Sequence, residues 1–386
     1  MNKKLYFCFG NNIKLIINNV RFHRSLIVGP VVDNYLPTKF NKREKIVTVF
    51  GATGFFGDYL LHELVKNGYQ LIIPYRGDIN DFKHLRMIGG VGQNLFSPFS
   101  PEDFNSIELA VKHSNVVINL IGKEFQSHQY SYRNINADFA GEIARISKRC
   151  GVEQFIHMSA LGASENPREH IPGAGCEYFK SKWLGEQEVT REFPGAVIIR
   201  PSAIWGKNDN FIFYFLSKYR RLNIRKPIIP IWKLGKETIK QPVYAEDVAK
   251  AISRIILHDK YKGCVIEPVG PQRFQLDHLV VWFYLNMKYK FEDIKIIELD
   301  QWFLLKAKWL PKLKYLISHY TLESLERECI TDQPTPGSIT LEHLDIIPCK
   351  LEDRLQWLVK PNHCIGYRWD EAGGFPPPPN PPLAYI

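Results

Sequence analysis

The sequence lacks a run of the ~18 consecutive apolar residues that a membrane-spanning helix requires, so we expect a soluble or peripheral protein. Its seven cysteines form no Cys-x-x-Cys pair, and no two histidines stand at metal-ligand spacing. Neither a disulfide framework nor a zinc site is therefore indicated, and no bound metal is expected. Scattered cysteines of this kind suit a reducing cellular interior.

Acidic residues are absent from positions 1–32, although five basic residues lie there: Lys3, Lys4, Lys14, Arg21 and Arg24. A basic, acid-free and amphipathic start is typical of a mitochondrial presequence. A secretory signal fits less well, because Asn, His and Arg interrupt its apolar stretch. We predict a presequence over residues 1–32, with a disordered basic arm as the alternative.

The composition is that of a globular protein, with 45% hydrophobic and 13% aromatic residues. Its 386 residues exceed the usual ~100–200 of a single domain, so one large or two merged domains are expected. The net charge of +10 favours anionic partners: cofactor phosphates, acidic lipid headgroups or an acidic protein face. Nucleic acid is not expected, because no nucleic-acid-binding motif accompanies the charge.

From Ile46 onward, short apolar runs alternate with helical stretches, the pattern of βαβ units on a parallel sheet. Gly68 and Gly151 stand where helices should end, and Ser100 stands where one should begin. These signals predict a Rossmann-type, doubly wound α/β sheet. Its strands are expected at residues 46–50, 70–74, 92–96, 116–121, 154–158 and 196–200.

Three glycines at three-residue spacing, Gly51, Gly54 and Gly57, follow the first strand and open the first helix. In a dinucleotide-binding loop the first glycine permits a tight turn and the second lets the backbone approach a pyrophosphate. The third lets the helix lie close to the sheet, and the alternative is a glycine-rich turn without a ligand. Three neighbours in the loop are expected to contact the same cofactor: Thr53, Phe55 and Phe56.

The second strand ends with Tyr75 where an NAD-binding unit usually carries an acid, and Arg76 follows it. A guanidinium would attract the 2′-phosphate of NADP(H), whereas a carboxylate would repel it. We therefore predict NADPH as the cofactor. In the alternatives, Arg76 is only solvated, or Asp78 serves as a displaced acid.

Several motifs occur in the order found in extended or atypical short-chain dehydrogenases/reductases, which this sequence resembles. They are VVINLIG (116–122), FIHMSALGA (155–163), YFKSK (178–182), IIRPSAIWG (198–206) and QPVYAEDVAKAI (241–252). Over roughly residues 44–270 the sequence is more closely similar to the dehydrogenase-like accessory subunits of mitochondrial respiratory complex I.

This resemblance implies a Rossmann fold that holds NADPH and a cleaved presequence. It also implies a peripheral position on the matrix side of the inner mitochondrial membrane, in contact with other complex I subunits. No part in NADH oxidation or quinone reduction is implied. Within the resemblance, four further positions should line the cofactor: Asn119, Leu120, Gly122 and Pro201. For Asn119 and Gly122 the alternative is an ordinary strand end.

Tyr178 and Lys182 have the i, i+4 spacing with which the catalytic tyrosine and lysine of active short-chain dehydrogenases share a helix face. We expect both residues beside the nicotinamide. The serine that completes such a site is offset, since Ser159 precedes Ala160 where the resemblance expects the hydroxyl. An offset of one position on a strand turns a side chain to the other face. We therefore expect a catalytically silent relic, unless Ser159 or Ser164 serves instead.

Three other residues are not expected to take part in catalysis or redox chemistry. His157 is expected to be a hydrogen-bonded core histidine, and Asp247 is expected to cap a helix and support packing. Cys176 is not expected to be a redox thiol, because only lysines nearby would lower its pKa.

We expect a dinucleotide-binding domain over residues 44–200, a smaller mixed region over 201–365 and a Pro-rich extended or disordered tail over 366–386. Segments 211–233 and 294–320 are basic and aromatic, which suits contact with anionic lipid or a neighbouring subunit. The alternative is that these segments form amphipathic helices packed on the core.

The favoured function is thus a non-catalytic accessory subunit stabilised by NADPH. One alternative is an active NADPH-dependent reductase or epimerase of a small carbonyl or sugar-nucleotide substrate. A weaker alternative is a regulator that senses the NADP(H) ratio.

Overall fold

The computed structural model describes residues 45–124, 130–171, 176–217, 220–223, 226–299, 321–362 and 379–384. The predicted presequence lies outside the described residues, as do positions 300–320 of the second basic segment and most of the Pro-rich tail. All described residues belong to one compact unit, Phe40–Ile386.

A seven-stranded parallel sheet forms the centre of the described chain, in the order β11-β6-β5-β4-β1-β2-β3. This order confirms the doubly wound α/β fold. The chain reverses direction across the sheet between β1 and β4, where ligands of such folds bind. The strands are β1 (Ile46–Phe50), β2 (Gln70–Tyr75), β3 (Asn94–Pro98), β4 (Val116–Asn119), β5 (Gln154–Met158), β6 (Val197–Ile199) and β11 (Val265–Ile266).

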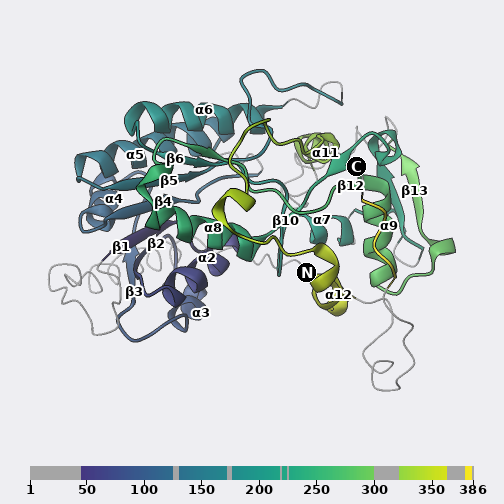
Figure 1. Ribbon diagram of the computed structural model, residues 1–386, viewed down its shortest axis with the longest axis horizontal. Helices are drawn as coiled ribbons and strands as arrows, with labels where there is room; N and C mark the ends of the chain where they lie inside the picture. The colour runs from purple at the N-terminus through teal and green to yellow at the C-terminus, as the bar shows by residue number, and fades with distance from the viewer. Residues whose placement is uncertain are drawn as a thin grey trace, which may run out of the picture. The chain divides into compact units, whose positions relative to one another are not determined.

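Helices cover both faces of the sheet (Figure 1). One face carries α2 (Phe55–Lys66) and α8 (Ala245–Leu257), and the other carries α4 (Phe104–Val111), α5 (Phe139–Arg149) and α6 (Glu177–Glu192). Both α8 and β11 lie beyond residue 200, so the sheet domain extends past the expected boundary there. Shorter helical elements are η2 (Ile79–Phe82), α3 (Lys83–Arg86), the π-helix η3 (Asn134–Asp138), η5 (Asp259–Tyr261), η6 (Phe291–Asp293), η8 (Glu342–Leu344) and η9 (Lys360–Asn362).

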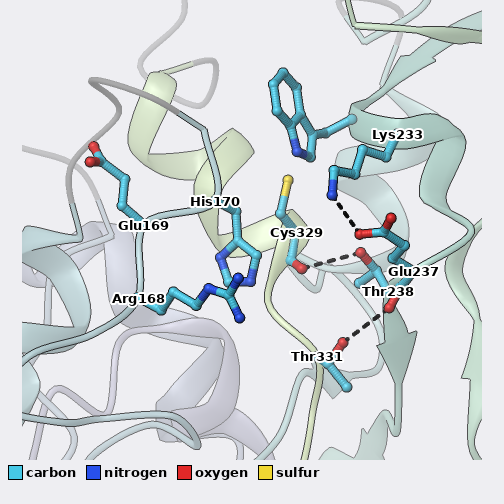
Figure 2. A pocket seen from close by; sticks show the side chains of 9 residues that line it. Arg168, Glu169, His170, Lys233, Glu237, Thr238, Cys329 and Thr331 are labelled. Carbon is cyan, nitrogen blue, oxygen red and sulfur yellow. Dashed lines mark hydrogen bonds and ion pairs between the residues drawn. The ribbon is translucent and has the colours of Figure 1, made fainter.

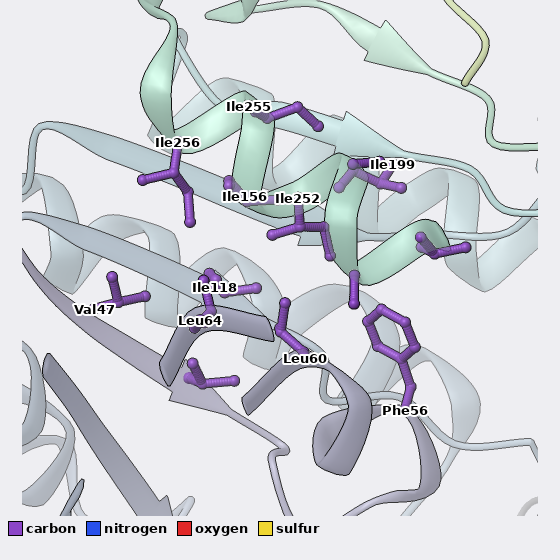
Figure 3. Packing of buried hydrophobic residues seen from close by; sticks show 14 of the residues in the cluster. Val47, Phe56, Leu60, Leu64, Ile118, Ile156, Ile199, Ile252, Ile255 and Ile256 are labelled. Carbon is purple, nitrogen blue, oxygen red and sulfur yellow. The ribbon is translucent and has the colours of Figure 1, made fainter. Parts of the chain in front are cut away.

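The largest core cluster lies between the sheet and helices α2 and α8 (Figure 3). Leu60 of α2 and Ile252 of α8 are fully buried there, against Ile118 and Ile156 of the sheet. Strands buried on both faces need apolar residues in continuous runs, and such runs are the pattern from which the sequence predicts these strands.

Two predicted helix ends are confirmed, and one predicted helix start is wrong. Gly68 and Gly151 follow α2 and α5 with φ of 80° and 78°. The helix predicted from Ser100 instead begins at Phe104, because Asp103 caps it by accepting the N–H of Asn105 at 3.1 Å.

The remaining elements form a mixed region with its own apolar core, which includes buried Phe215, Phe283 and Leu355. Since Phe215 lies in segment 211–233, this part of the segment is core rather than exposed surface. Three two-stranded sheets occur in the described part of this region: β10–β7, β12–β9 and β13–β8. Its elements are β7 (Ile204–Trp205), α7 (Ile212–Leu216), β8 (Ile228–Ile231), η4 (Trp232–Gly235), β9 (Ile239–Lys240), β10 (Val243–Tyr244), β12 (Phe274–Gln275), α9 (Leu276–Asn286), β13 (Lys295–Glu298), α11 (Leu322–Cys329) and α12 (Leu351–Val359).

Two side-chain hydrogen bonds join helices α8 and α9 to later parts of the chain. Asp247 does not cap α8, whose N-cap is Tyr244; its carboxylate accepts the N–H of Cys349 at 2.6 Å. Trp282 donates its indole N–H to the carbonyl of Pro379 at 3.1 Å. Across the described residues, no helix has the length and apolarity needed to cross a bilayer.

Replacing Ile252 by Ala should lower the free energy of unfolding by about 2–5 kcal/mol, because it leaves a cavity between α8 and the sheet. Leu257→Ala, on the same helix but 46% exposed, is the matched control and should change stability by less than ~0.5 kcal/mol. Urea unfolding followed by circular dichroism measures both. Equal losses would show that α8 does not pack on the sheet through this face.

Candidate functional site

Two positions in the loop between β1 and α2 require glycine because a side chain there would clash with the protein's own backbone. Gly51 has φ +78°, and a Cβ there would lie 3.0 Å from the backbone nitrogen of Ile121. A Cβ on Gly57 would overlap the carbonyl oxygen of Ala52. Gly54 differs, since its Cβ would meet only the carbonyl oxygen of Gly51, at 3.4 Å. Gly54 therefore borders open space, where the backbone is accessible to a ligand.

The N-terminus of α2 opens onto the same space. Gly54 is its N-cap, and no side chain accepts a hydrogen bond from this end of the helix. The first N–H groups of a helix have no acceptor within it, so those of Phe55 and Phe56 are available to an anion. The Phe56 side chain itself is buried in the core, and Thr53 is exposed beside the loop.

At the end of β2, the predicted adenosine side, Arg76 is exposed. The alternative acid, Asp78, accepts the N–H of Asn80 at 2.9 Å and so caps η2. This hydrogen bond lowers the pKa of Asp78. One oxygen of this carboxylate is engaged in its own turn, and Arg76 is an exposed cation at the same strand end. Tyr75 packs its ring 6.4 Å from that of Phe96.

A second cation approaches Arg76 from the loop after β4. The Lys123 ammonium lies 5.0 Å from the ring centroid of Tyr130, and the Arg76 guanidinium lies 5.9 Å from the same centroid. Burial and the charge of Arg76 lower the pKa of Lys123. Sequence reasoning missed Lys123 and Tyr130, although Lys123 directly follows the recognised NLIG motif.

At the other end of the crevice, Lys182 of α6 is buried and donates to the carbonyl of Met158 at 3.2 Å. Burial lowers the pKa of Lys182 to about 8, against the opposing charges of Glu124 and Glu186. A Cβ on Gly122 would lie 2.8 Å from the Lys182 ammonium, so glycine makes room for this lysine.

Tyr178 lies half-buried one helical turn before Lys182. Burial raises the pKa of its phenol to about 12, although the charge of Arg327 acts in the opposite direction. The Arg327 guanidinium lies 4.7 Å from the Tyr178 ring centroid, and the ring of Tyr132 lies 6.1 Å away. The phenol is therefore protonated at neutral pH and covered on one face by a cation.

Ser159 is buried, and its hydroxyl hydrogen-bonds to the carboxylate of Glu186. The same carboxylate accepts two hydrogen bonds from Arg200, at 2.9 and 2.6 Å. The Ser159 hydroxyl is thus part of a buried ion-pair network rather than a free partner for a substrate. Ser164 lies half-buried in the loop that follows, and Pro201 is buried just after β6.

Asn119 and His157 form a buried pair on neighbouring strands, with Nδ2 and Nδ1 3.3 Å apart. Asn119 also accepts the N–H of Ile121 at 3.0 Å, which shapes the loop through Leu120 toward Gly122. His157 is a buried core histidine paired through Nδ1, and its Nε2 has no partner among the described residues. Burial lowers the pKa of His157 to about 3, so it stays neutral.

Asn136 lies in the π-helix η3 and joins the crevice loop to α6. Its Oδ1 accepts the N–H of Lys123 at 2.9 Å, and its Nδ2 donates to the hydroxyl of Ser181 at 2.9 Å. A Cβ on Gly185 would overlap the Asn136 carbonyl oxygen, so α6 approaches this turn closely. Single π turns are frequent at functional sites. The sequence analysis missed Asn136; the polar run NINAD inside a helix was the available signal.

Cys176 lies beside a pocket, and its thiol is held in the protonated form. Burial and the nearby Glu326 raise the pKa of Cys176 to about 12. A polar pocket of about 280 Å³ lies close by, between residues 168–170, 232–238 and 329–331 (Figure 2). Its Lys233 is paired with Glu237 at 2.7 Å. Within the described ranges, no group of three His, Cys, Asp or Glu could hold a metal.

Comparison with known proteins identifies the class. Residues 47–266 match the NAD dependent epimerase/dehydratase family, and the chain belongs to this family. A solved structure of UDP-glucose 4-epimerase from Thermotoga maritima superposes with a TM-score of 0.59, covering 82% of this chain and 97% of the other. At 17% identity this likeness concerns the fold alone.

Within the family, the chain is a homologue of the mitochondrial NADH dehydrogenase (ubiquinone) 1 alpha subcomplex subunit 9. It is 37% identical to the Mus musculus protein over 331 residues, covering 84% of this chain and 81% of the relative. It is 41% identical to the Rattus norvegicus protein over 239 residues. That second match spans 62% of this chain and 60% of the relative, less than two thirds of its length.

Substitutions of two loop glycines should separate an effect on folding stability from an effect on dinucleotide binding. Gly57→Ala should lower the free energy of unfolding by about 3 kcal/mol, because the new methyl group overlaps backbone. Gly54→Ala should cost less than ~1 kcal/mol, the loss of a good N-cap. It should nevertheless weaken dinucleotide affinity about tenfold or more, or at least 1.4 kcal/mol.

Chemical unfolding without nucleotide, together with fluorescence titration of NADPH, measures both effects. A Gly54→Ala variant that binds NADPH as tightly as the wild type would exclude this loop as the pyrophosphate site.

Proposed function

We propose that this chain is a non-catalytic accessory subunit of mitochondrial complex I that binds NADPH as a structural cofactor. In this role it lies on the matrix side of the inner membrane and supports the matrix arm near the membrane arm. The observation that carries the proposal is the open backbone at Gly54, bordered by cations at one end of the crevice and by Tyr178 and Lys182 at the other. The printed name of the mouse and rat relatives supports the assembly partner.

NADPH is favoured over NADH by charge. Arg76 and Lys123 converge on the ring of Tyr130, so a 2′-phosphate in this region meets two cations. The nearby Asp78 uses one carboxylate oxygen to cap η2. A doubly charged phosphate near two cations is stabilised strongly where water is partly excluded.

Catalytic silence is supported by the state of the catalytic candidates. The Ser159 hydroxyl hydrogen-bonds to Glu186, and Ala160 offers no replacement. Losing one positioned polar group lowers rates by about two to three orders of magnitude. Arg327 also covers one face of the Tyr178 ring.

As a structural cofactor, NADPH would stabilise the fold by mass action. A ligand present at 100 times its dissociation constant contributes ~2.7 kcal/mol to the native state. Since the nucleotide would touch β1, β2, β4 and α6 together, its binding joins the two halves of the sheet domain. The subunit would then be more stable where NADPH is available.

A surface at one end of the β8–β13 sheet suits contact with anionic lipid or an acidic subunit. Leu222 is 48% exposed and Phe291 is 71% exposed. Lys226 pairs with Asp293 at 3.4 Å, close to Phe291, and Lys295 is exposed on the adjoining strand. Exposed aromatic and aliphatic groups between lysines are typical of surfaces that bind lipid headgroups.

An active NADPH-dependent reductase or epimerase is the second candidate, favoured by the retained Tyr178 and Lys182 on one helix face. A sugar nucleotide is a reasonable class to test, since the similar epimerase structure contains UDP-glucose. Turnover by the purified protein that disappears in Tyr178→Phe would establish this function. Absence of turnover with intact NADPH binding supports the structural role.

Replacing Arg76 by Glu should weaken NADPH binding by about tenfold to a hundredfold, because it places like charges together, each factor of ten being ~1.4 kcal/mol. NADH affinity should not fall. Arg86→Glu, an exposed arginine whose guanidinium lies over Phe96 at 5.6 Å, is the control and should leave both affinities unchanged. Isothermal titration measures the four constants, and equal losses for NADPH and NADH would defeat the assignment.

In mitochondria that express the chain, native-gel fractionation should place it with complex I rather than alone. Gly57→Ala should reduce both its abundance and the assembled complex, because a destabilised subunit is degraded. Gly195→Ala is the control, since a Cβ there meets nothing closer than 3.9 Å. A wild-type chain that migrates only as a free protein would contradict the proposed role.

A further inference from the structure

Helix α11 brings an unusual number of charges into the protein interior. Glu323, Glu326 and Glu328 are all buried, and the Arg327 side chain is only 22% exposed. Thr321 begins the helix with a capping box. Buried charges need partners, so this helix should be held in place by the groups that it contacts.

The three carboxylates bind three different parts of the chain. Glu323 accepts the N–H of Tyr178 at 2.7 Å and so caps α6. Glu326 accepts the N–H groups of residues 170 and 171, at 2.6 and 2.8 Å. Glu328 forms a two-pronged ion pair with Arg220, at 2.7 and 2.9 Å. Together these contacts fix the position of Arg327 between them.

Arg327 contacts both the tyrosine of α6 and the loop after β4. Its guanidinium covers the Tyr178 ring at 4.7 Å and pairs with Glu124 of the loop after β4 at 3.6 Å. The backbone carbonyl of Glu124 also accepts the hydroxyl of Tyr132 at 3.0 Å. The Nε atom of Arg327 is buried and has no acceptor among the described residues.

Glu124 directly follows Lys123, which reaches the Tyr130 ring beside Arg76. Two contacts therefore hold the short stretch from Gly122 to Glu124. Lys123 contacts the Tyr130 ring on the predicted adenosine side, and Glu124 forms an ion pair with Arg327 of α11. This stretch follows the end of β4, which pairs with β1 next to the glycine loop, so a dinucleotide bound at that loop would lie near it.

We infer that Arg327 and Glu124 act as a latch that retains the bound dinucleotide by closing the nicotinamide end of the crevice. This inference rests on the proposed binding of NADPH. In it, α11 belongs to the mixed region but determines how long the sheet domain keeps its cofactor. Arg327 and Glu124 are positioning residues, since they act on the loop and on Tyr178 rather than on a reacting atom.

The test is the rate of nucleotide release from the full chain, measured by stopped-flow fluorescence when excess NADP⁺ displaces NADPH. Arg327→Lys keeps the charge but loses the planar fork, and Glu124→Gln removes the partner charge. Each should speed release about tenfold, and the double variant should exceed the larger single effect by little, because both break one interaction. Arg254→Ala, which breaks an Arg–Asp345 pair of the same 3.6 Å length elsewhere, should not change the rate.

Adenosine 2′,5′-bisphosphate separates a latch from general damage, because this fragment fills the adenosine end and lacks nicotinamide. Its release should be unchanged in all variants. Faster release of both ligands would indicate a loosened fold and overturn the latch. NADPH release at the wild-type rate, or tighter binding, would overturn it too while leaving the proposed function intact. If the wild-type chain bound neither the fragment nor NADPH, both the latch and the proposed function would be wrong.

Discussion

The backbone contact between Gly57 and Ala52 is the constraint on which the candidate site depends. Because Gly57 has no side chain, the first turn of α2 rests directly on the loop that leaves β1. This contact aims the free N–H groups of the helix across the sheet at the point where the strand order reverses. The cations after β2 and β4 and the tyrosine and lysine of α6 belong to the same candidate site as this loop.

Much of the fold could be predicted because parallel strands are continuous apolar runs separated by helices of ordinary length. The errors have local causes. Ser100 and Asp103 are both good caps three residues apart, and only the structure shows that Asp103 is used. Strand β11 has two residues, too few to carry a periodic signal, so its return to the sheet could not be read from the sequence.

The candidate site likewise contains residues that the sequence predicts and residues that only the structure reveals. The glycine loop, Tyr178 and Lys182 belong to short motifs, whose spacing is visible in one segment of sequence. Arg327 and Glu124 are far apart in the chain, and nothing in the spacing of either predicts their ion pair. The offset of Ser159 raised the expectation of a silent site, but its partner Glu186 lies on another element and could be named only from coordinates.

The late position of β11 has a consequence for biosynthesis. This strand pairs with β6 at the sheet edge, yet some sixty residues separate Ile199 from Val265. At ~5–20 residues per second, ribosomes need several seconds to supply the covering strand. Until then β6, paired with β5 on one side only, presents an open apolar strand edge, a template for aggregation. A holdase chaperone that shields β6 during this interval would raise the yield of folded protein.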